Sequence, residues 1–183
     1  MRSMRHFRIR SPLRILSDRR GATAVEFAML AIPVIGVLIA ALQMAVISFY
    51  SEALQTVAAT AARQVMVGNV QSQGLTQAQF KTLVCNAAPA PFSSNNCNAL
   101  MVDIQSAPSF SALTTQPITI TSNSNGTGSC TCSFAPGGEG SAVIVRVMYE
   151  WPVFGGPLGI GIANEGNGTR LMVGTAVFQT EPY

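Results

Sequence analysis

The most pronounced pattern in the chain is an unbroken apolar run near its beginning. Residues 27–50 read FAMLAIPVIGVLIAALQMAVISFY, 24 positions whose strongly polar members are Gln43 and Ser48. At about 1.5 Å per residue this run makes a helix of about 36 Å, enough to cross a hydrocarbon core of about 30 Å with some tilt. We therefore predict one transmembrane helix, in which Pro33 and Gly36 are tolerated and introduce a bend.

The same helix is predicted to continue beyond the apolar run. Within residues 51–67 the apolar side chains recur at helical spacing on one face, and Glu52, Gln55 and Arg63 lie elsewhere. That face consists of Leu54, Val57, Ala58, Ala61 and Val65. Gly68-Asn69 is an ordinary C-terminal stop, which gives one helix of about 45 residues. Its many small residues suit either a simple anchor with a stalk or a helix that packs among copies or relatives.

A short helix is predicted next, over about residues 77–86. Thr76 and Gln79 have the spacing of a capping box, and Leu75 and Phe80 have the spacing of a hydrophobic staple. Both features mark a helix N-terminus.

After this helix the hydrophobic period changes to two, which is typical of strands. The strand-like segments are residues 101–105, 117–121, 142–149 and 170–178. Runs rich in Ser, Asn, Gly and Pro separate them. The order predicts an α+β fold in which an antiparallel sheet of three or four strands follows a long N-terminal helix. The predicted organisation is a basic leader (1–21), a transmembrane and spine helix (22–68) and an exported α+β domain (69–183).

Charge is distributed unevenly along the chain. Residues 1–21 carry seven arginines and Asp18, a net charge of +6, whereas the remainder carries −3. The positive-inside rule keeps the arginine-rich side cytoplasmic, so residues after about 51 are expected in the periplasm. A cleaved secretory signal is the rival interpretation, but its apolar core is usually about 7–15 residues long. The acidic body excludes a nucleic-acid-binding face.

The junction between leader and helix has a more specific arrangement. Arg19-Arg20-Gly21 is followed by four residues, then by Glu26 and Phe27 at the head of the apolar run. A carboxylate at the start of a membrane helix is costly to desolvate unless it finds a partner, which makes Glu26 a candidate functional residue. Its alternative role is that of a headgroup-level charge favoured by the helix N-terminus.

Residues 19–65 resemble the TadE-like segment of minor pilins and pseudopilins from tight-adherence (Tad, or Flp) type IV pilus systems. Fainter similarity continues in VIVRVMYEWPVF and in the closing VFQTEPY. The resemblance implies a pilin-like fold, cleavage by a prepilin peptidase between Gly21 and Ala22, and pairing of Glu26 with the N-terminal amine of a neighbouring subunit. It also implies, as partners, other pilins, Tad inner-membrane assembly proteins and the lipid bilayer. Phe27 stands where major Flp pilins have tyrosine, which favours the minor-pilin branch.

The four cysteines all follow the apolar helix, on the oxidising side of the predicted topology. They are Cys85, Cys97, Cys130 and Cys132, for which three pairings exist. We predict a Cys85–Cys97 disulfide, and the pairing of the closely spaced Cys130 and Cys132 stays open. A zinc site is the rival interpretation, but one C-x-C without a nearby histidine is a weak signal, so no metal is expected.

The residue inventory argues against an enzyme and against a cofactor. The single histidine, His6, lies in the leader, so the exported part has no Ser-His-Asp or Cys-His site, and no P-loop or dinucleotide fingerprint occurs. Four glutamates are interpreted as scattered solvated or strand-edge charges rather than a catalytic pair: Glu139, Glu150, Glu165 and Glu181.

Two smaller features receive structural interpretations. The group Asn164, Glu165 and Asn167 is interpreted as an ordinary turn rather than a calcium loop. Trp151 and Phe154 are interpreted as core or strand-end packing.

Two functions remain from the sequence. The first is a minor pilin or pseudopilin that takes part in assembling an adhesive pilus after processing at Gly21. The second is a single-pass, membrane-anchored periplasmic binding or scaffold protein that keeps its leader.

Overall fold

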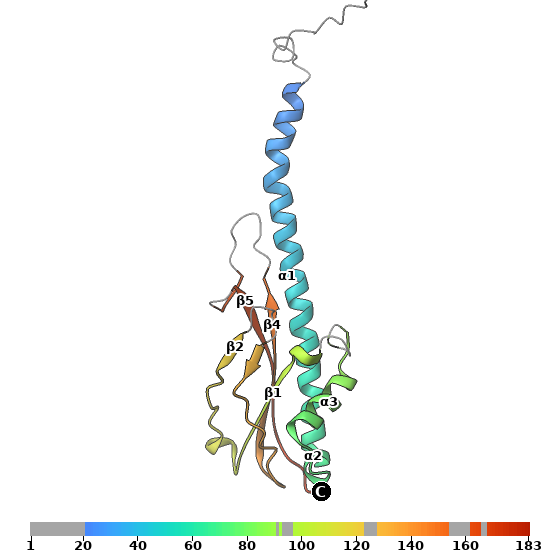
Figure 1. Ribbon diagram of the computed structural model, residues 1–183, viewed down its shortest axis with the longest axis vertical. Helices are drawn as coiled ribbons and strands as arrows, with labels where there is room; N and C mark the ends of the chain where they lie inside the picture. Colours follow the sequence, from blue (N-terminus) through green and yellow to red (C-terminus); the bar gives the residue numbers. More distant parts are fainter. Residues whose placement is uncertain (1–20, 91, 93–96, 123–127, 154–161, 166–167) are drawn as a thin grey trace, which may run out of the picture.

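One long helix dominates the computed structural model, which describes residues 21–90, 92, 97–122, 128–153, 162–165 and 168–183. Helix α1 (Ala22–Met66) has 45 residues and runs without interruption through Pro33. Its N-terminal part, up to about residue 38, stands clear of the other described residues, and the remainder lies along the folded domain (Figure 1). The predicted continuous helix is therefore confirmed, as is its end before Gly68, which has a φ of 73°.

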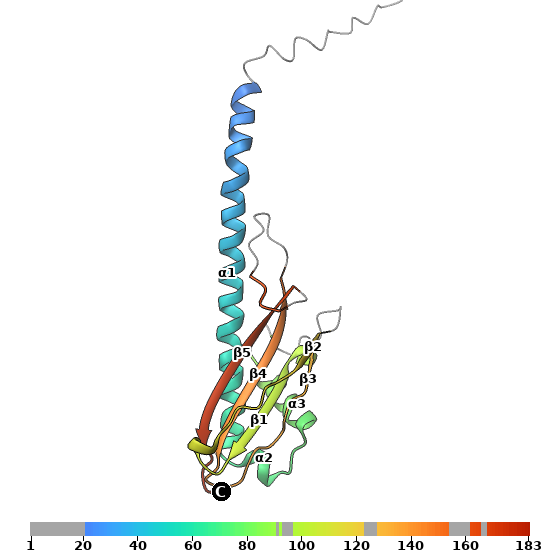
Figure 2. The same cartoon turned by 90° about the vertical axis from the view of Figure 1, so that its left-hand side faces the viewer.

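The folded domain is built on a three-stranded antiparallel sheet. Its strands are β1 (Met101–Ala107), β4 (Ala142–Pro152) and β5 (Thr169–Gln179), in the order β1-β4-β5. Figure 2 shows these strands side by side in front of α1. The α+β class and the three-stranded antiparallel sheet are as predicted.

A second, two-stranded sheet was not predicted in this form. It pairs β2 (Ile120–Ser122) with β3 (Gly128–Cys130). The predicted strand over 117–121 was wrong in its bounds, and β3 falls in a polar run that the sequence analysis interpreted as a separator. These short strands depend on one another, since the backbone of Thr131 donates to Thr119 just beyond the paired residues.

The core lies between α1 and one face of the sheet. The α1 face predicted from helical spacing is buried, with all five of its side chains at 0% exposure. It packs on alternate residues of β4, namely Val143, Val145, Val147 and Tyr149. Gly174 on β5 brings the sheet close to α1, because a Cβ there would lie 2.5 Å from the carbonyl oxygen of Leu54.

Side-chain amides also fasten the free edge of β5. The Gln55 amide donates to the Thr175 carbonyl at 2.8 Å and accepts from the Thr175 amide at 3.1 Å. Asn164 does the same for Leu171, at 3.2 and 2.7 Å. Each amide hydrogen-bonds the backbone of one β5 residue, as a neighbouring strand would. The Gln55 amide also ties α1 to this edge of the sheet.

Short helices close the end of the domain farthest from the start of α1. Helix α2 (Asn69–Ser72) follows Gly68 directly, and α3 (Gln77–Ala87) begins with the predicted capping box between Thr76 and Gln79. Two 3₁₀ turns, η3 (Cys97–Ala99) and η4 (Phe110–Ala112), flank β1. The last residues return to this end, where the Glu181 amide donates to the Met66 carbonyl at 2.9 Å.

Candidate functional site

The beginning of α1 is exposed and unobstructed. Gly21 is the N-cap residue, and no described atom outside its neighbours would lie within 4 Å of a Cβ placed there. Glu26 is exposed on the second turn, and Phe27 is 74% exposed. The arginines of the leader lie outside the described residues. A protein that acts on the Gly21–Ala22 bond would meet no obstruction from the described part of the folded domain.

Glu26 is an isolated carboxylate on an apolar helix. It has no hydrogen-bond or ion-pair partner among the residues that the structure describes. The neighbouring Met29 and Leu30 are 72% and 69% exposed, so the surface around the carboxylate is apolar. In lipid such a carboxylate needs a cation from another molecule or contact with the headgroup region.

The first half of α1 has the properties of a membrane span. Within the described residues, one helix is long and apolar enough to cross a membrane, with a mean hydropathy of 2.5 over an 18-residue stretch. All the large apolar side chains from Val25 to Leu38 are more than half exposed. Exposure of so much apolar surface to water is unfavourable, so we expect lipid or protein around this part of the helix.

An aromatic cluster marks the level at which α1 meets the sheet. Tyr50 of α1 lies 4.3 Å from Trp151 and 5.5 Å from Phe92, measured between ring centroids. Tyr149 packs at 5.1 Å against Phe92, and its burial, together with nearby Tyr50, raises the pKa of the Tyr149 hydroxyl. The strand-end packing predicted for Trp151 is confirmed, whereas Phe154 lies outside the described residues.

A buried ion pair lies on the sheet face away from α1, and the sequence analysis missed it. Asp103 is fully buried and accepts from Arg146 Nη2 at 2.8 Å and from Arg146 Nε at 3.1 Å. Asp103 also accepts from the Ser133 amide at 2.7 Å, and Arg146 donates to the Gln116 carbonyl at 3.0 Å. The pair satisfies its charges internally and holds the β2–β3 side of the domain on the sheet, which is a structural role.

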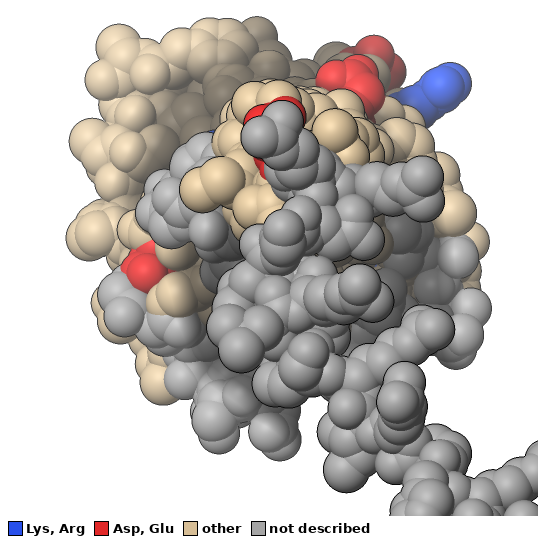
Figure 3. All heavy atoms as spheres, turned by 90° about the horizontal axis from the view of Figure 1, so that it is seen from above, with Lys and Arg blue, Asp and Glu red and all other residues tan. Residues whose placement is uncertain are grey.

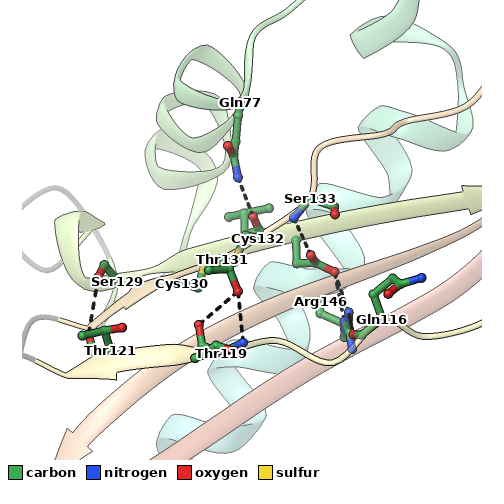
Figure 4. The surroundings of a disulfide bond; sticks show 12 residues. Gln77, Gln116, Thr119, Thr121, Ser129, Cys130, Thr131, Cys132, Ser133 and Arg146 are labelled. Atoms are coloured by element: carbon green, nitrogen blue, oxygen red, sulfur yellow. Dashed lines mark hydrogen bonds and ion pairs between the residues drawn. A yellow bond between two sulfur atoms is a disulfide. The ribbon is translucent and has the colours of Figure 1, made fainter.

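The four cysteines form two disulfides. Cys85 and Cys97 are joined as predicted, with a Cα–Cα distance of 5.6 Å. Cys130 and Cys132, whose pairing the sequence left open, are joined to each other with a Cα–Cα distance of 5.1 Å (Figure 4). The two bonds differ in environment, since Cys85 and Cys97 are 8% and 6% exposed and Cys130 and Cys132 are half-buried.

This difference predicts stepwise reduction. We expect a mild dithiol to reduce Cys130–Cys132 before Cys85–Cys97, because attack by a thiolate requires access to the sulfur. Timed alkylation followed by peptide mass spectrometry measures the order. The Cys130→Ser/Cys132→Ser double variant should retain the slow step alone. Simultaneous modification of all four thiols would contradict the prediction.

A shallow groove of about 400 Å³ lies between α3 and β3, next to the second disulfide. Its lining includes Gln77, Lys81 and Cys130. Partial burial lowers the pKa of the Lys81 amine from its ordinary value. Gln77 is engaged with the Val102 carbonyl at 3.1 Å, so the groove wall is stabilised by contacts within the domain.

The described residues do not form a metal centre. Among them, no group of three or more His, Cys, Asp and Glu side chains is placed to hold a metal ion. Asn164 binds the Leu171 backbone, and Asn167, the other asparagine of the predicted turn, lies outside the described residues. Glu150 corrects the expectation of a solvated or strand-edge charge, because it is 2% exposed and its Oε1 accepts from Thr169 at 3.4 Å.

Comparison with family models, with curated protein sequences and with solved structures finds no match to this chain.

Proposed function

We propose that the chain is a minor pilin or pseudopilin of the TadE-like type, which takes part in assembling a Tad/Flp-type IV pilus used in surface adhesion. The observation that carries the proposal is the division of α1 into two halves. Its N-terminal part is an exposed apolar helix with an accessible Gly21 and with a Glu26 that has no partner among the described residues, and its second half is fixed to a small antiparallel sheet. This geometry suits a subunit that exchanges lipid for neighbouring helices without unfolding its domain.

In the proposed pathway the protein first crosses the bacterial inner membrane once, with its N-terminus cytoplasmic and its domain periplasmic. A prepilin peptidase then hydrolyses the Gly21–Ala22 peptide bond, which releases the basic leader and creates an α-amine on Ala22. That amine lies about one helical turn from Glu26 of its own chain. In an assembly, Glu26 pairs with the amine of a neighbouring subunit, because two opposite charges in lipid satisfy one another.

The intact mass of the membrane-extracted protein tests the first step of this pathway. We expect a chain of 162 residues beginning at Ala22 from cells with an active prepilin peptidase. The full chain of 183 residues is expected from otherwise identical cells without the peptidase, which serve as the control. An unprocessed N-terminus in both would contradict the proposal and favour an anchored periplasmic binding or scaffold protein.

A further inference from the structure

An apolar groove lies where the end of the sheet meets the first half of α1. The groove has a volume of about 210 Å³. Its lining comes from α1, from the end of β4 and from the segment that precedes β5: Ile39, Leu42, Gln43, Val46, Trp151, Val153 and Ile162. Pockets for small molecules usually measure about 300–1,000 Å³, so this groove suits a slender apolar group better.

The length of α1 determines where this groove lies relative to a membrane. If the groove stood clear of the hydrocarbon, the span would have to end before Ile39 and would contain only residues 27–38 of the apolar run. Those 12 residues make about 18 Å of helix, well short of a hydrocarbon core of about 30 Å. A span of about 20 residues reaches Val46 if it begins at Phe27, and Ala41 if it begins at Ala22, as a Glu26–amine pair in lipid requires, so the α1 side of the groove lies in or at the edge of the hydrocarbon.

The domain side of the groove has the chemistry of a membrane interface. Trp151 contacts Tyr50, and tryptophan and tyrosine are enriched at the level of lipid headgroups. Arg170 is the cross-strand partner of Trp151 and donates a hydrogen bond to the Ile162 carbonyl at 2.9 Å. This bond positions Ile162 beside the groove. Viewed from the N-terminal end of α1, most of the described surface that is visible is uncharged, and several of its charged side chains gather at one margin (Figure 3).

We propose that this end of the domain, formed by Trp151, Val153 and Ile162, is embedded in the adjacent lipid leaflet and that the groove holds a phospholipid acyl chain. The groove is continuous along Leu42 and Val46 with the bare apolar surface of α1, where these side chains are 66% and 41% exposed. Among the described residues, lipid that surrounds the helix therefore has an apolar path along Leu42 and Val46 into the groove. The embedded end fixes the height and tilt of the domain above the membrane.

Trp151 allows a direct test, because it is the only tryptophan in the chain. The full-length protein is placed in nanodiscs at one copy per disc, made of phosphatidylethanolamine and phosphatidylglycerol with brominated acyl chains. We expect the brominated chains to remove most of the Trp151 emission, compared with discs of the same lipids without bromine. Aqueous iodide should have little effect.

A double variant, Trp151→Phe with Phe110→Trp, provides the matched control. Phe110 is 56% exposed in η4, just beyond the end of β1 that pairs with Ala142 and so at the other end of the sheet. Its tryptophan should respond to iodide and not to brominated lipid. The proposal is overturned if Trp151 itself responds to iodide alone or if neither quencher reaches it.

This inference depends on α1 crossing a bilayer and is independent of cleavage at Gly21. Quenching without cleavage would leave it standing while contradicting the proposed function. Cleavage without lipid quenching would contradict this inference and leave the proposed function in place.

Discussion

Gly174→Val is expected to force α1 away from the sheet and to destabilise the folded domain by more than about 3 kcal/mol, beyond the usual cost of overpacking. A Cβ at this position would lie 2.5 Å from the Leu54 oxygen and 3.1 Å from the Gln55 nitrogen. Both are backbone atoms of α1, so no side-chain rotation relieves the clash. Movement of the helix would also break the paired hydrogen bonds between Gln55 and Thr175.

Unfolding of the detergent-solubilised protein by heat or denaturant measures this loss, and limited proteolysis reports whether α1 has separated. Gly138→Val is the matched control, because a Cβ at Gly138 would have nothing within 4 Å. We expect the control to stay within about 0.5 kcal/mol of the wild-type protein, as exposed substitutions usually do. Equal unfolding midpoints for the two variants would show that the close approach at Gly174 does not limit stability.

Local patterns were sufficient to predict much of this fold. The length of α1, its buried face and the capping box at Thr76 depend on side chains close together in sequence, where helical spacing and hydrogen-bonding chemistry are decisive. The three main strands follow from a period of two. The strands β2 and β3 could not be predicted in the same way, because each has three residues and is held mainly by the other.

The features that sequence analysis missed depend on strand register. Asp103 lies opposite Arg146 in the β1–β4 ladder, and only that pairing makes a buried carboxylate acceptable inside an apolar strand. The sequence signal for this ion pair was a charged residue at the centre of each of two apolar runs. Glu150 and Gly174 are similar cases, since burial of the carboxylate and the closeness of α1 arise only when distant segments meet.

The candidate site also has parts that are local in sequence and parts that depend on distant segments. The junction residues could be named because Gly21 and Glu26 lie within one short motif, and the structure adds that both are exposed at the free end of α1. The groove proposed to hold an acyl chain could not be predicted, because its lining joins residues separated by more than a hundred positions. Its Trp151 side had been interpreted only as packing.

Glu26→Gln is expected to leave insertion and cleavage largely unchanged and to abolish incorporation of the protein into pili. The substitution keeps the size of the side chain and removes its charge, which leaves the Ala22 amine of a neighbouring subunit without a counter-ion in lipid. Removal of one partner from a buried ion pair costs about 3–5 kcal/mol. At about 1.4 kcal/mol per factor of ten, this corresponds to a loss of more than about 100-fold in subunit association.

Glu52→Gln is the matched control, because Glu52 is an exposed carboxylate on the same helix and lies beyond the apolar run. Both variants are compared by intact mass for cleavage, by immunoblot of sheared surface pili for incorporation, and by adhesion of the cells to a surface. We expect the Glu52 variant to match the wild-type protein in all three measurements and the Glu26 variant in the first alone. Normal piliation and adhesion with Glu26→Gln would make Glu26 a headgroup-level charge that stabilises the helix N-terminus, a role worth about 0.3–1 kcal/mol and too small to control assembly.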